Sequence, residues 1–334
     1  MPRGPRLDAP GALHHVMARG IERCDIFRDD IDRDRFVESL ISLARRGAFE
    51  IFAWALMPNH FHLLVKTTSQ PLGRSMRCLL TRHAVRFNRR HGRVGHLFQN
   101  RYKSVICQED KYFLELVRYI HLNPVRGGLV AAVELEEYRY TGHSVLLAPC
   151  RRSWQRIDDV LTRFAGDPAA ARDAYRRFVT AGVDQGRRPD LVGGGLVRSA
   201  GGWQIVKELR RGREAFESDE RVLGDGDFVR RILRGFAERT QQSNDRAAEI
   251  SLQGVIRAVT RATGVRDSGV LAKGRLPATC RTREGVAYLW VERLGRNGRE
   301  LARALGVHPS SVYRASQRGR DEAARWDLVL RQCD

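Results

Sequence analysis

The chain of 334 residues is long enough for two or three domains with their own hydrophobic cores, and no run of about 18 apolar residues predicts a membrane span. Its formal net charge of +20 predicts attraction to polyanions such as nucleic acids. The scattered cysteines favour reduced thiols in a cytosol, so the expected location is cytoplasmic and nucleoid-associated. The six cysteines are scattered without a CxxC pair, and residues 1–6 lead into no apolar core. We therefore expect no disulfide framework, zinc ribbon or secretory signal.

The first half of the chain alternates between the two-residue period of strands and the 3.6-residue period of helices. Strand 50–57 is apolar on both sides and is therefore expected to be central, and the Pro58-Asn59 break predicts a hairpin with the next strand. The order β-α-β-β-α-β, followed by one more helix, is typical of an α+β domain with a ferredoxin-like (split βαβ) antiparallel sheet. The predicted strands are 12–18, 50–57, 60–66 and 101–107, and the predicted helices are 29–46, 72–90 and 108–123.

The pattern changes near Pro149. Residues 150–250 look helical, with a Gly-rich stretch at 190–203 that we interpret as a loop or linker, and the chain is helical again from Ser251. We therefore expect three domains: a sheet domain at 1–148, a mostly helical region at 149–250 and a helical domain at 251–334.

A helix-turn-helix pattern lies near the end of the chain. Leu301 and Leu305 would pack the first helix, Gly306 would make the turn, and a recognition helix would start at Pro309. A plain helical hairpin is the alternative interpretation.

His60 and His62 flank Phe61 in the strand predicted at 60–66. Side chains alternate along a strand, so both imidazoles point to one face and Phe61 points to the other. Two imidazoles on a rigid strand can hold a divalent cation, either Mg²⁺ or, better suited to nitrogen ligands, Mn²⁺. A third ligand would still be needed, and an isolated pair of this kind is more often an ordinary core or surface feature.

Tyr119 and Asn123 are four residues apart on the last predicted helix of the first half and therefore share a face. A tyrosine hydroxyl can attack a phosphodiester that a cation polarises, and the Asn123 amide oxygen could complete the metal shell. Glu115 is the rival ligand and Tyr112 the rival nucleophile. Considered alone, Tyr119 is more often a core or interface aromatic, and His121, off this face, is expected to be structural.

Basic side chains surround these motifs. Arginines decorate the exposed side of helix 72–90, where the alternative is an ordinary solvated face, and more basic residues open strand 101–107. The predicted DNA contacts are Arg74, Arg77, Arg82, Arg86, Arg101 and Lys103, together with Ser310, Ser311 and Arg314 of the helix-turn-helix.

Four blocks occur in order within residues 10–148: His-Val-Met-Ala-Arg-Gly (15–20), Pro-Asn-His-Phe-His-Leu-Leu (58–64), Gly-His-Leu-Phe-Gln-Asn-Arg-Tyr-Lys-Ser (95–104) and Arg-Tyr-Ile-His-Leu-Asn-Pro-Val-Arg (118–126). They resemble the signature segments of the REP-associated tyrosine transposases, single-strand DNA transposases of the HUH endonuclease superfamily. The C-terminal block resembles, more loosely, the DNA-binding domain of the replication initiator DnaA.

The resemblance implies a metal site at His60 and His62, a nucleophile at Tyr119 and metal assistance from Asn123. It implies cleavage and rejoining of single-stranded DNA through a 5′-phosphotyrosine, at hairpin-forming repeats, by a monomer or homodimer. Duplex DNA could be bound through the C-terminal domain. Two other functions stay open: a non-catalytic DNA-binding regulator, and a nicking enzyme of rolling-circle replication or the relaxase type.

Overall fold

The computed structural model describes residues 7–148, 154–186, 188, 191, 219–271, 274 and 276–330, with the backbone alone at 242–249. The chain forms two compact units, Met1–Phe236 and Ala237–Asp334, which are considered separately below. The predicted Gly-rich linker at 190–203 lies, apart from Leu191, outside the described residues.

Unit 1 is built on a five-stranded sheet in the order β2-β3-β1-β4-β5. The first four strands pair antiparallel, and β5 adds to β4 in parallel. The α+β class and the order β1-α1-β2-β3-α2-β4 agree with the prediction from the sequence. The elements are β1 (Leu13–Arg19), α1 (Asp30–Arg45), β2 (Phe49–Met57), β3 (His60–Thr67), α2 (Leu72–Arg90), β4 (Lys103–Cys107) and β5 (Val222–Leu223).

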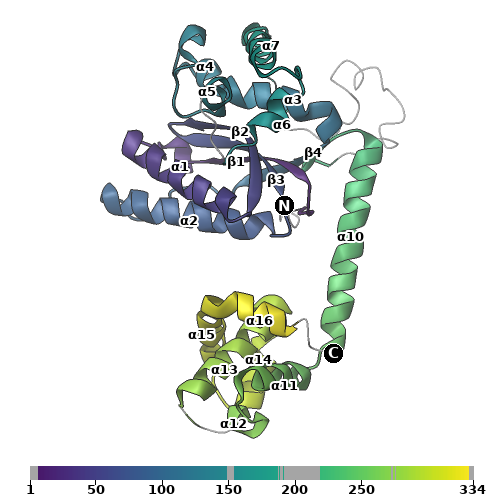
Figure 1. Cartoon of the computed structure of the whole chain (residues 1–334). Helices are drawn as coiled ribbons and strands as arrows, with labels where there is room; N and C mark the ends of the chain where they lie inside the picture. Colours follow the sequence, from purple (N-terminus) through teal and green to yellow (C-terminus); the bar gives the residue numbers. More distant parts are fainter. Residues whose placement is uncertain are drawn as a thin grey trace, which may run out of the picture. The chain divides into compact units, whose positions relative to one another are not determined.

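The expected central position of strand 50–57 is wrong, because β2 is the last strand at one end of the sheet. It is apolar on both sides because helices cover both faces of the sheet (Figure 1). Its outer edge is protected as well, by isolated bridges from Ile51 to Gln155 and from Ala55 to Thr141. A buried edge strand and a central strand therefore carry the same sequence pattern.

Helices α1 and α2 cover one face of the sheet, and the helices α3 to α7 cover the other (Figure 1). On the first face, Phe61 of β3 packs against Phe36 of α1 with ring centroids 4.9 Å apart. On the second face, Phe52 of β2 meets Phe113 of α3 at 5.2 Å. The second layer consists of α3 (Glu109–His121), α4 (Asn123–Arg126), α5 (Gly142–Leu147), α6 (Ile157–Leu161) and α7 (Pro168–Thr180).

The core of unit 1 continues past residue 148, where the sequence suggested the end of the sheet domain. Trp154 and Tyr175 are buried in the same core as the strands. The Tyr175 hydroxyl of α7 lies 2.8 Å from Nδ1 of His121 and 2.7 Å from Nδ1 of His143. His121 is fully buried in this contact, in keeping with the structural role expected for it.

A chain that ends at Ala148 is therefore expected to lose cooperative folding, whereas a chain that ends at Phe236 keeps it. The shorter chain lacks Trp154 and Tyr175, and truncating one large aromatic core residue costs about 3–5 kcal/mol out of a total stability of about 5–15 kcal/mol. Thermal unfolding followed by circular dichroism measures the difference. Equal melting temperatures for the two truncated chains would contradict this account of the core.

The far edge of β4 is covered by a segment distant in sequence. Val222 of β5 pairs with Ile106, and Val229 of α10 (Gly226–Glu249) packs in the same small cluster. The Gln108 side chain accepts from the backbone N–H of Asp225 at 3.0 Å. Strand addition satisfies backbone groups of β4 that would otherwise form an open edge.

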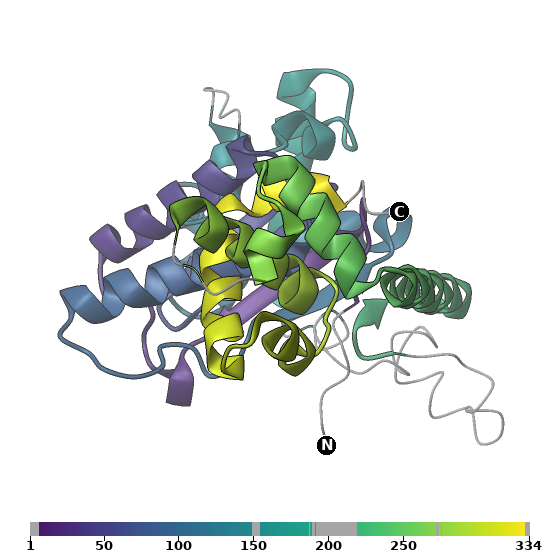
Figure 2. The ribbon, with the colours of Figure 1, turned by 90° about the horizontal axis from the view of Figure 1, so that it is seen from below.

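Unit 2 is helical, as expected from Ser251 onward, and its helices gather into one bundle (Figure 2). Trp326 lies in its core against Gly285, where an added Cβ would lie 2.9 Å from the indole, so the small residue permits the close contact. The helices are α11 (Leu252–Thr263), α12 (Asp267–Leu271), α13 (Pro277–Ala287), a π-helix (Tyr288–Arg293), α14 (Gly298–Leu305), α15 (Pro309–Gly319) and α16 (Ala323–Leu330).

Candidate functional site

A cleft of about 820 Å³ in unit 1 brings together residues from distant parts of the sequence. β1, β3 and β4 line it, together with the end of α3, the turn into α4 and residues 220–221. Of the residues predicted to act on DNA or metal, the cleft is lined by His60, His62, Arg101, Lys103, Tyr119 and Asn123.

The register of the sheet puts the two histidines side by side. His60 lies opposite Arg19 of β1, and His62 lies opposite Met17. Both side chains line the cleft, and their ring centroids are 5.2 Å apart with the ring planes at 81°. Phe61 between them points into the layer of α1 and α2, as strand alternation requires.

The hydrogen bonds of Asn59 fix the tautomer of His60. The Asn59 amide nitrogen donates to the carbonyl oxygen of Arg23 at 3.1 Å, and a carbonyl oxygen can only accept. The other amide atom, Oδ1, lies 2.6 Å from Nδ1 of His60, so this ring nitrogen donates to it. A neutral His60 then carries its lone pair on Nε2, the atom left for a metal or substrate.

His62 is held by a third imidazole, that of His15 on β1. The two rings stack with centroids 5.1 Å apart, and Nε2 of His15 lies 2.9 Å from Nδ1 of His62. His15 is the first residue of the block at 15–20 that resembles the transposase family, but the sequence indicated no role for it. The signal that could have found it is the spacing of His15, Met17 and Arg19, which puts all three on one face of β1.

Both cleft histidines are neutral near pH 7. Burial, with a smaller contribution from the charge of Arg19, lowers the pKa of His60 to about 4. Burial is also the largest cause that lowers the pKa of His62 well below its ordinary value, followed by the neighbouring His15 and His60. Neutral imidazoles are the form that binds metal ions.

Tyr119 lies edge-on to this cluster from α3. Its ring centroid is 5.8 Å from that of His62 and 5.9 Å from that of His15, and the Arg126 guanidinium lies 5.4 Å from the ring centre. The contacts of the Tyr119 ring with these two imidazoles and with the guanidinium hold the phenol beside the histidine pair. Burial is the largest cause of a lowered pKa at Arg126.

The helix is interrupted at Leu122, between the end of α3 at His121 and the start of α4 at Asn123. The single predicted helix over 108–123 is therefore two helices, and Asn123 is the first residue of α4. Its amide nitrogen donates to the carbonyl oxygen of Tyr119 at 2.9 Å, which caps the end of α3. The amide oxygen is the atom left for other contacts in the cleft.

The two rivals named from the sequence lie elsewhere. Glu115 binds Arg118 at 2.7 Å and Arg188 at 3.1 Å, and neither it nor Tyr112 is among the residues that line the cleft. The geometry therefore favours Tyr119 and Asn123 over Tyr112 and Glu115 as the pair beside the histidines.

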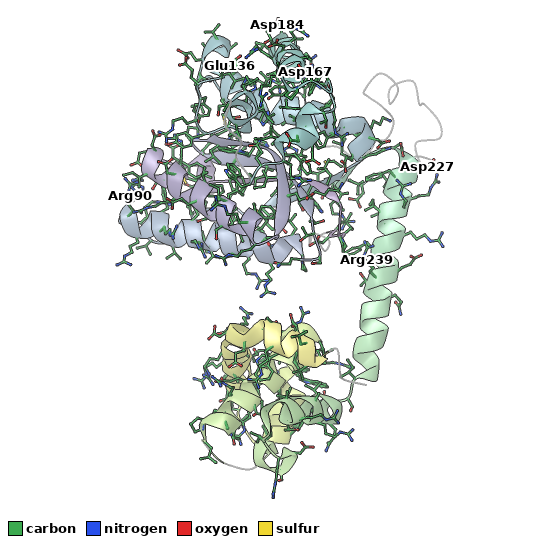
Figure 3. The ribbon with its side chains drawn as sticks, in the orientation of Figure 1. Arg90, Glu136, Asp167, Asp184, Asp227 and Arg239 are labelled. Carbon is green, nitrogen blue, oxygen red and sulfur yellow. The ribbon has the colours of Figure 1, made fainter. Side chains whose placement is uncertain are left out.

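The predicted DNA contacts of unit 1 fall on two different surfaces. Arg101 and Lys103 are exposed at the cleft. The arginines of α2 lie on the layer that covers the opposite face of the sheet, with Arg74, Arg77 and Arg86 exposed and Arg82 half-buried, and none of the four lines the cleft. Arg90 lies at the end of α2 and is labelled in Figure 3. Its guanidinium donates to Asp29 at 2.6 Å and to Asp32 at 2.8 Å.

In unit 2 the segment predicted to be a helix-turn-helix has two helices and a tight turn. α14 ends at Leu305, the following Gly306 has a φ of 63° in the left-handed region, and the side chain of His308 caps α15. Ser310 and Arg314 are exposed on α15, and Ser311 is half-buried. DNA binding by this segment stays a prediction.

No group of three or more His, Cys, Asp or Glu residues suited to a metal ion occurs in the part of the chain that the structure describes. The cleft brings together the imidazoles of His60 and His62 and the amide of Asn123, and Gln99, Asn100 and Glu220 line it as well. Among the described residues no helix is long and apolar enough to span a membrane.

Comparisons with known proteins address this same region. Residues 11–123 match the model of a family described as "Transposase IS200 like". Among solved structures, the chain is similar to one described as "Structure of the REP associates tyrosine transposase bound to a REP hairpin", with 20% sequence identity and a TM-score of 0.37 over 50% of this chain and 93% of that chain. No curated protein matches the chain. The resemblance predicted from the sequence is therefore confirmed for residues 11–123, which carry the pattern of the IS200-like transposases and include the two cleft histidines, Tyr119 and Asn123.

Proposed function

We propose that this protein cleaves and rejoins single-stranded DNA at hairpin-forming repeats, with the help of a divalent metal ion and through a 5′-phosphotyrosine at Tyr119. The main observation behind the proposal is that Tyr119 lines the same cleft as His60 and His62 and contacts His62. The family match over residues 11–123 and the net charge of +20 support a DNA substrate.

The donor set fits a divalent ion. Asn59 occupies Nδ1 of His60, no hydrogen bond to its Nε2 occurs among the described residues, and His62 is a buried neutral imidazole beside it. The amide oxygen of Asn123 is the third candidate ligand. Mg²⁺ or Mn²⁺ bound there would draw negative charge away from the scissile phosphate.

The residues of the chain then have separate roles. The hydroxyl of Tyr119 loses its proton as its oxygen attacks phosphorus and forms a new P–O bond. The bond from phosphorus to the 3′ oxygen breaks, and this departing oxygen gains a proton, so the numbers of bonds and protons are unchanged. The products are a 5′-phosphate ester on Tyr119 and a free 3′-OH. Attack of a 3′-OH on that ester reverses the exchange and releases Tyr119, so rejoining needs no other energy source. Arg101 and Lys103 would bind neighbouring phosphates.

Within one chain, His60, His62 and Tyr119 line the same cleft. We therefore propose that a monomer is competent for cleavage, and that dimerisation would serve the pairing of two DNA ends. A DNA-binding regulator would need neither the free imidazole nitrogens nor a tyrosine beside them. A relaxase-type nicking enzyme usually accompanies a helicase, and no P-loop motif occurs in the sequence.

The test is capture of the covalent intermediate. A labelled single strand that contains a hairpin is incubated with the full chain and Mn²⁺, and a protein–DNA adduct that survives denaturation is mapped by peptide analysis. The proposal expects an ion-dependent adduct. Tight binding of the same strand without any adduct, with or without Mn²⁺, would favour the regulator.

The C-terminal helices are expected to add affinity for duplex DNA. Arg314 is exposed on α15, and Arg314→Ala should weaken binding and lower the slope of log affinity against log salt by about one. Arg261→Ala, an exposed arginine on α11, is the matched control. Salt-dependent fluorescence anisotropy with duplex DNA measures both. If the two variants behave alike, the affinity comes from diffuse charge and α15 is not a recognition helix.

A further inference from the structure

His15 is a fully buried imidazole that reaches the proposed metal site from a neighbouring strand. Its Nε2 atom lies 2.9 Å from Nδ1 of His62, and its side chain is 0% exposed. We propose that His15 is a positioning residue: it accepts the Nδ1–H of His62 and thereby leaves Nε2 of His62 as the metal-binding atom. This inference rests on the proposed function.

The chemistry of two facing ring nitrogens allows only two arrangements for neutral imidazoles. If His15 donates, the proton of His62 sits on Nε2 and that atom cannot ligate a metal. If His62 donates from Nδ1, its Nε2 carries a lone pair. A metal site at Nε2 therefore requires His15 to be the acceptor.

The neighbouring histidine shows the same construction. His60 donates its Nδ1–H to the amide oxygen of Asn59, whose orientation is fixed by Arg23. Both proposed ligands thus have an acceptor on Nδ1, an amide oxygen in one case and an imidazole nitrogen in the other. Acceptors in this position commonly orient metal-binding histidines and influence metal affinity about 10–100-fold.

His15 also contacts the proposed nucleophile. Its ring meets the ring of Tyr119 edge-on at 5.9 Å and stacks on His62 at 5.1 Å. One side chain therefore touches both the ligand and the tyrosine, and it limits how far either ring can turn relative to the other.

The adjacent residue offers a matched control. His14 is also 0% exposed, but it points to the opposite face of β1, and neither of its ring nitrogens has a hydrogen-bond partner among the described residues. Replacing His14 therefore tests the loss of a buried imidazole from β1 without a change at the cleft.

The experiment compares His15→Phe, His15→Gln and His14→Phe in the full chain, with Mn²⁺ affinity measured by calorimetry in the absence of DNA. Phe keeps a flat ring but cannot accept, whereas the Gln amide oxygen can. We expect His15→Phe to weaken Mn²⁺ binding about 10–100-fold, His15→Gln to restore most of it, and His14→Phe to bind as the original chain does. Equal Mn²⁺ affinity in His15→Phe and His14→Phe would overturn the positioning role.

A second measurement needs no variant. Long-range proton–nitrogen NMR correlations report which ring nitrogen of His62 carries the proton. A proton on Nδ1 supports the inference, and a proton on Nε2 overturns it. Failure of the original chain to bind Mn²⁺ at all would overturn the metal-dependent function and this inference together. A chain that binds Mn²⁺ through His60, yet equally well without His15, overturns this inference alone.

Discussion

Tyr119→Phe is expected to abolish the covalent protein–DNA adduct and to lower cleavage of single-stranded hairpin DNA at least about 10³-fold. The substitution removes only the hydroxyl. The ring contacts with His62, His15 and Arg126 remain, so the stability should change by less than about 1 kcal/mol. Denaturing gels of labelled DNA measure the adduct, and thermal unfolding confirms that the fold is retained.

Tyr112→Phe is the matched control for this substitution. Tyr112 lies on the same helix, α3, two turns before Tyr119 and outside the lining of the cleft. It therefore lacks the neighbours that place Tyr119 beside the histidine pair, and its loss should leave the adduct at its original level. An adduct that persists in Tyr119→Phe, or a DNA-linked peptide that contains Tyr112, would show that Tyr119 is not the nucleophile.

The secondary structure of the first half of the chain follows closely from local patterns. The helix at 72–90 has the predicted ends, and the four predicted strands differ from β1 to β4 by one or two residues. Local hydrophobic periodicity specifies these elements because each one buries a face of its own. The two-residue strand β5 is too short to have a periodicity, and only its pairing with β4 defines it.

The sequence predicts those features of the candidate site that depend on a single strand or helix. Strand alternation is enough to put His60 and His62 on one face. Strand alternation also gives the face of β1 on which His15 lies, but its pairing with His62 depends on the register of β1 with β3, which the sequence does not specify. The same holds for Tyr175, which joins the core of unit 1 through side chains of α3 and α5 that lie more than 30 residues away in sequence.

The basic residues show a different limit of sequence reasoning. Charge on a helix predicts an exposed face but not which surface of the molecule that face belongs to. The arginines of α2 therefore lie on the opposite layer from the cleft, whereas Arg101 and Lys103 line it. Neutralising Arg101 and Lys103 would thus be expected to affect binding of the scissile strand more than neutralising Arg74 and Arg77.

His60→Ala and His62→Ala are each expected to abolish detectable cleavage and to reduce Mn²⁺ affinity to background, because two imidazoles are the core of the proposed donor set. Their effects on stability should differ. His60 is half-buried, and in His60→Ala the Oδ1 atom of Asn59 can accept a hydrogen bond from water instead. This substitution should therefore have little effect on the free energy of unfolding. His62→Ala leaves the buried His15 nitrogen without its partner and should cost about 1–3 kcal/mol.

Calorimetry with Mn²⁺, hairpin cleavage and thermal unfolding separate these effects in the same preparations. His96→Ala is the control, because this imidazole is exposed and does not line the cleft. It should bind Mn²⁺, cleave and unfold as the original chain does. Because the stability change is confined to His62→Ala, loss of cleavage in His60→Ala cannot be attributed to unfolding. Full cleavage by His60→Ala, or cleavage that survives EDTA, would show that the histidine pair is structural and that Tyr119 acts, if at all, without a metal ion.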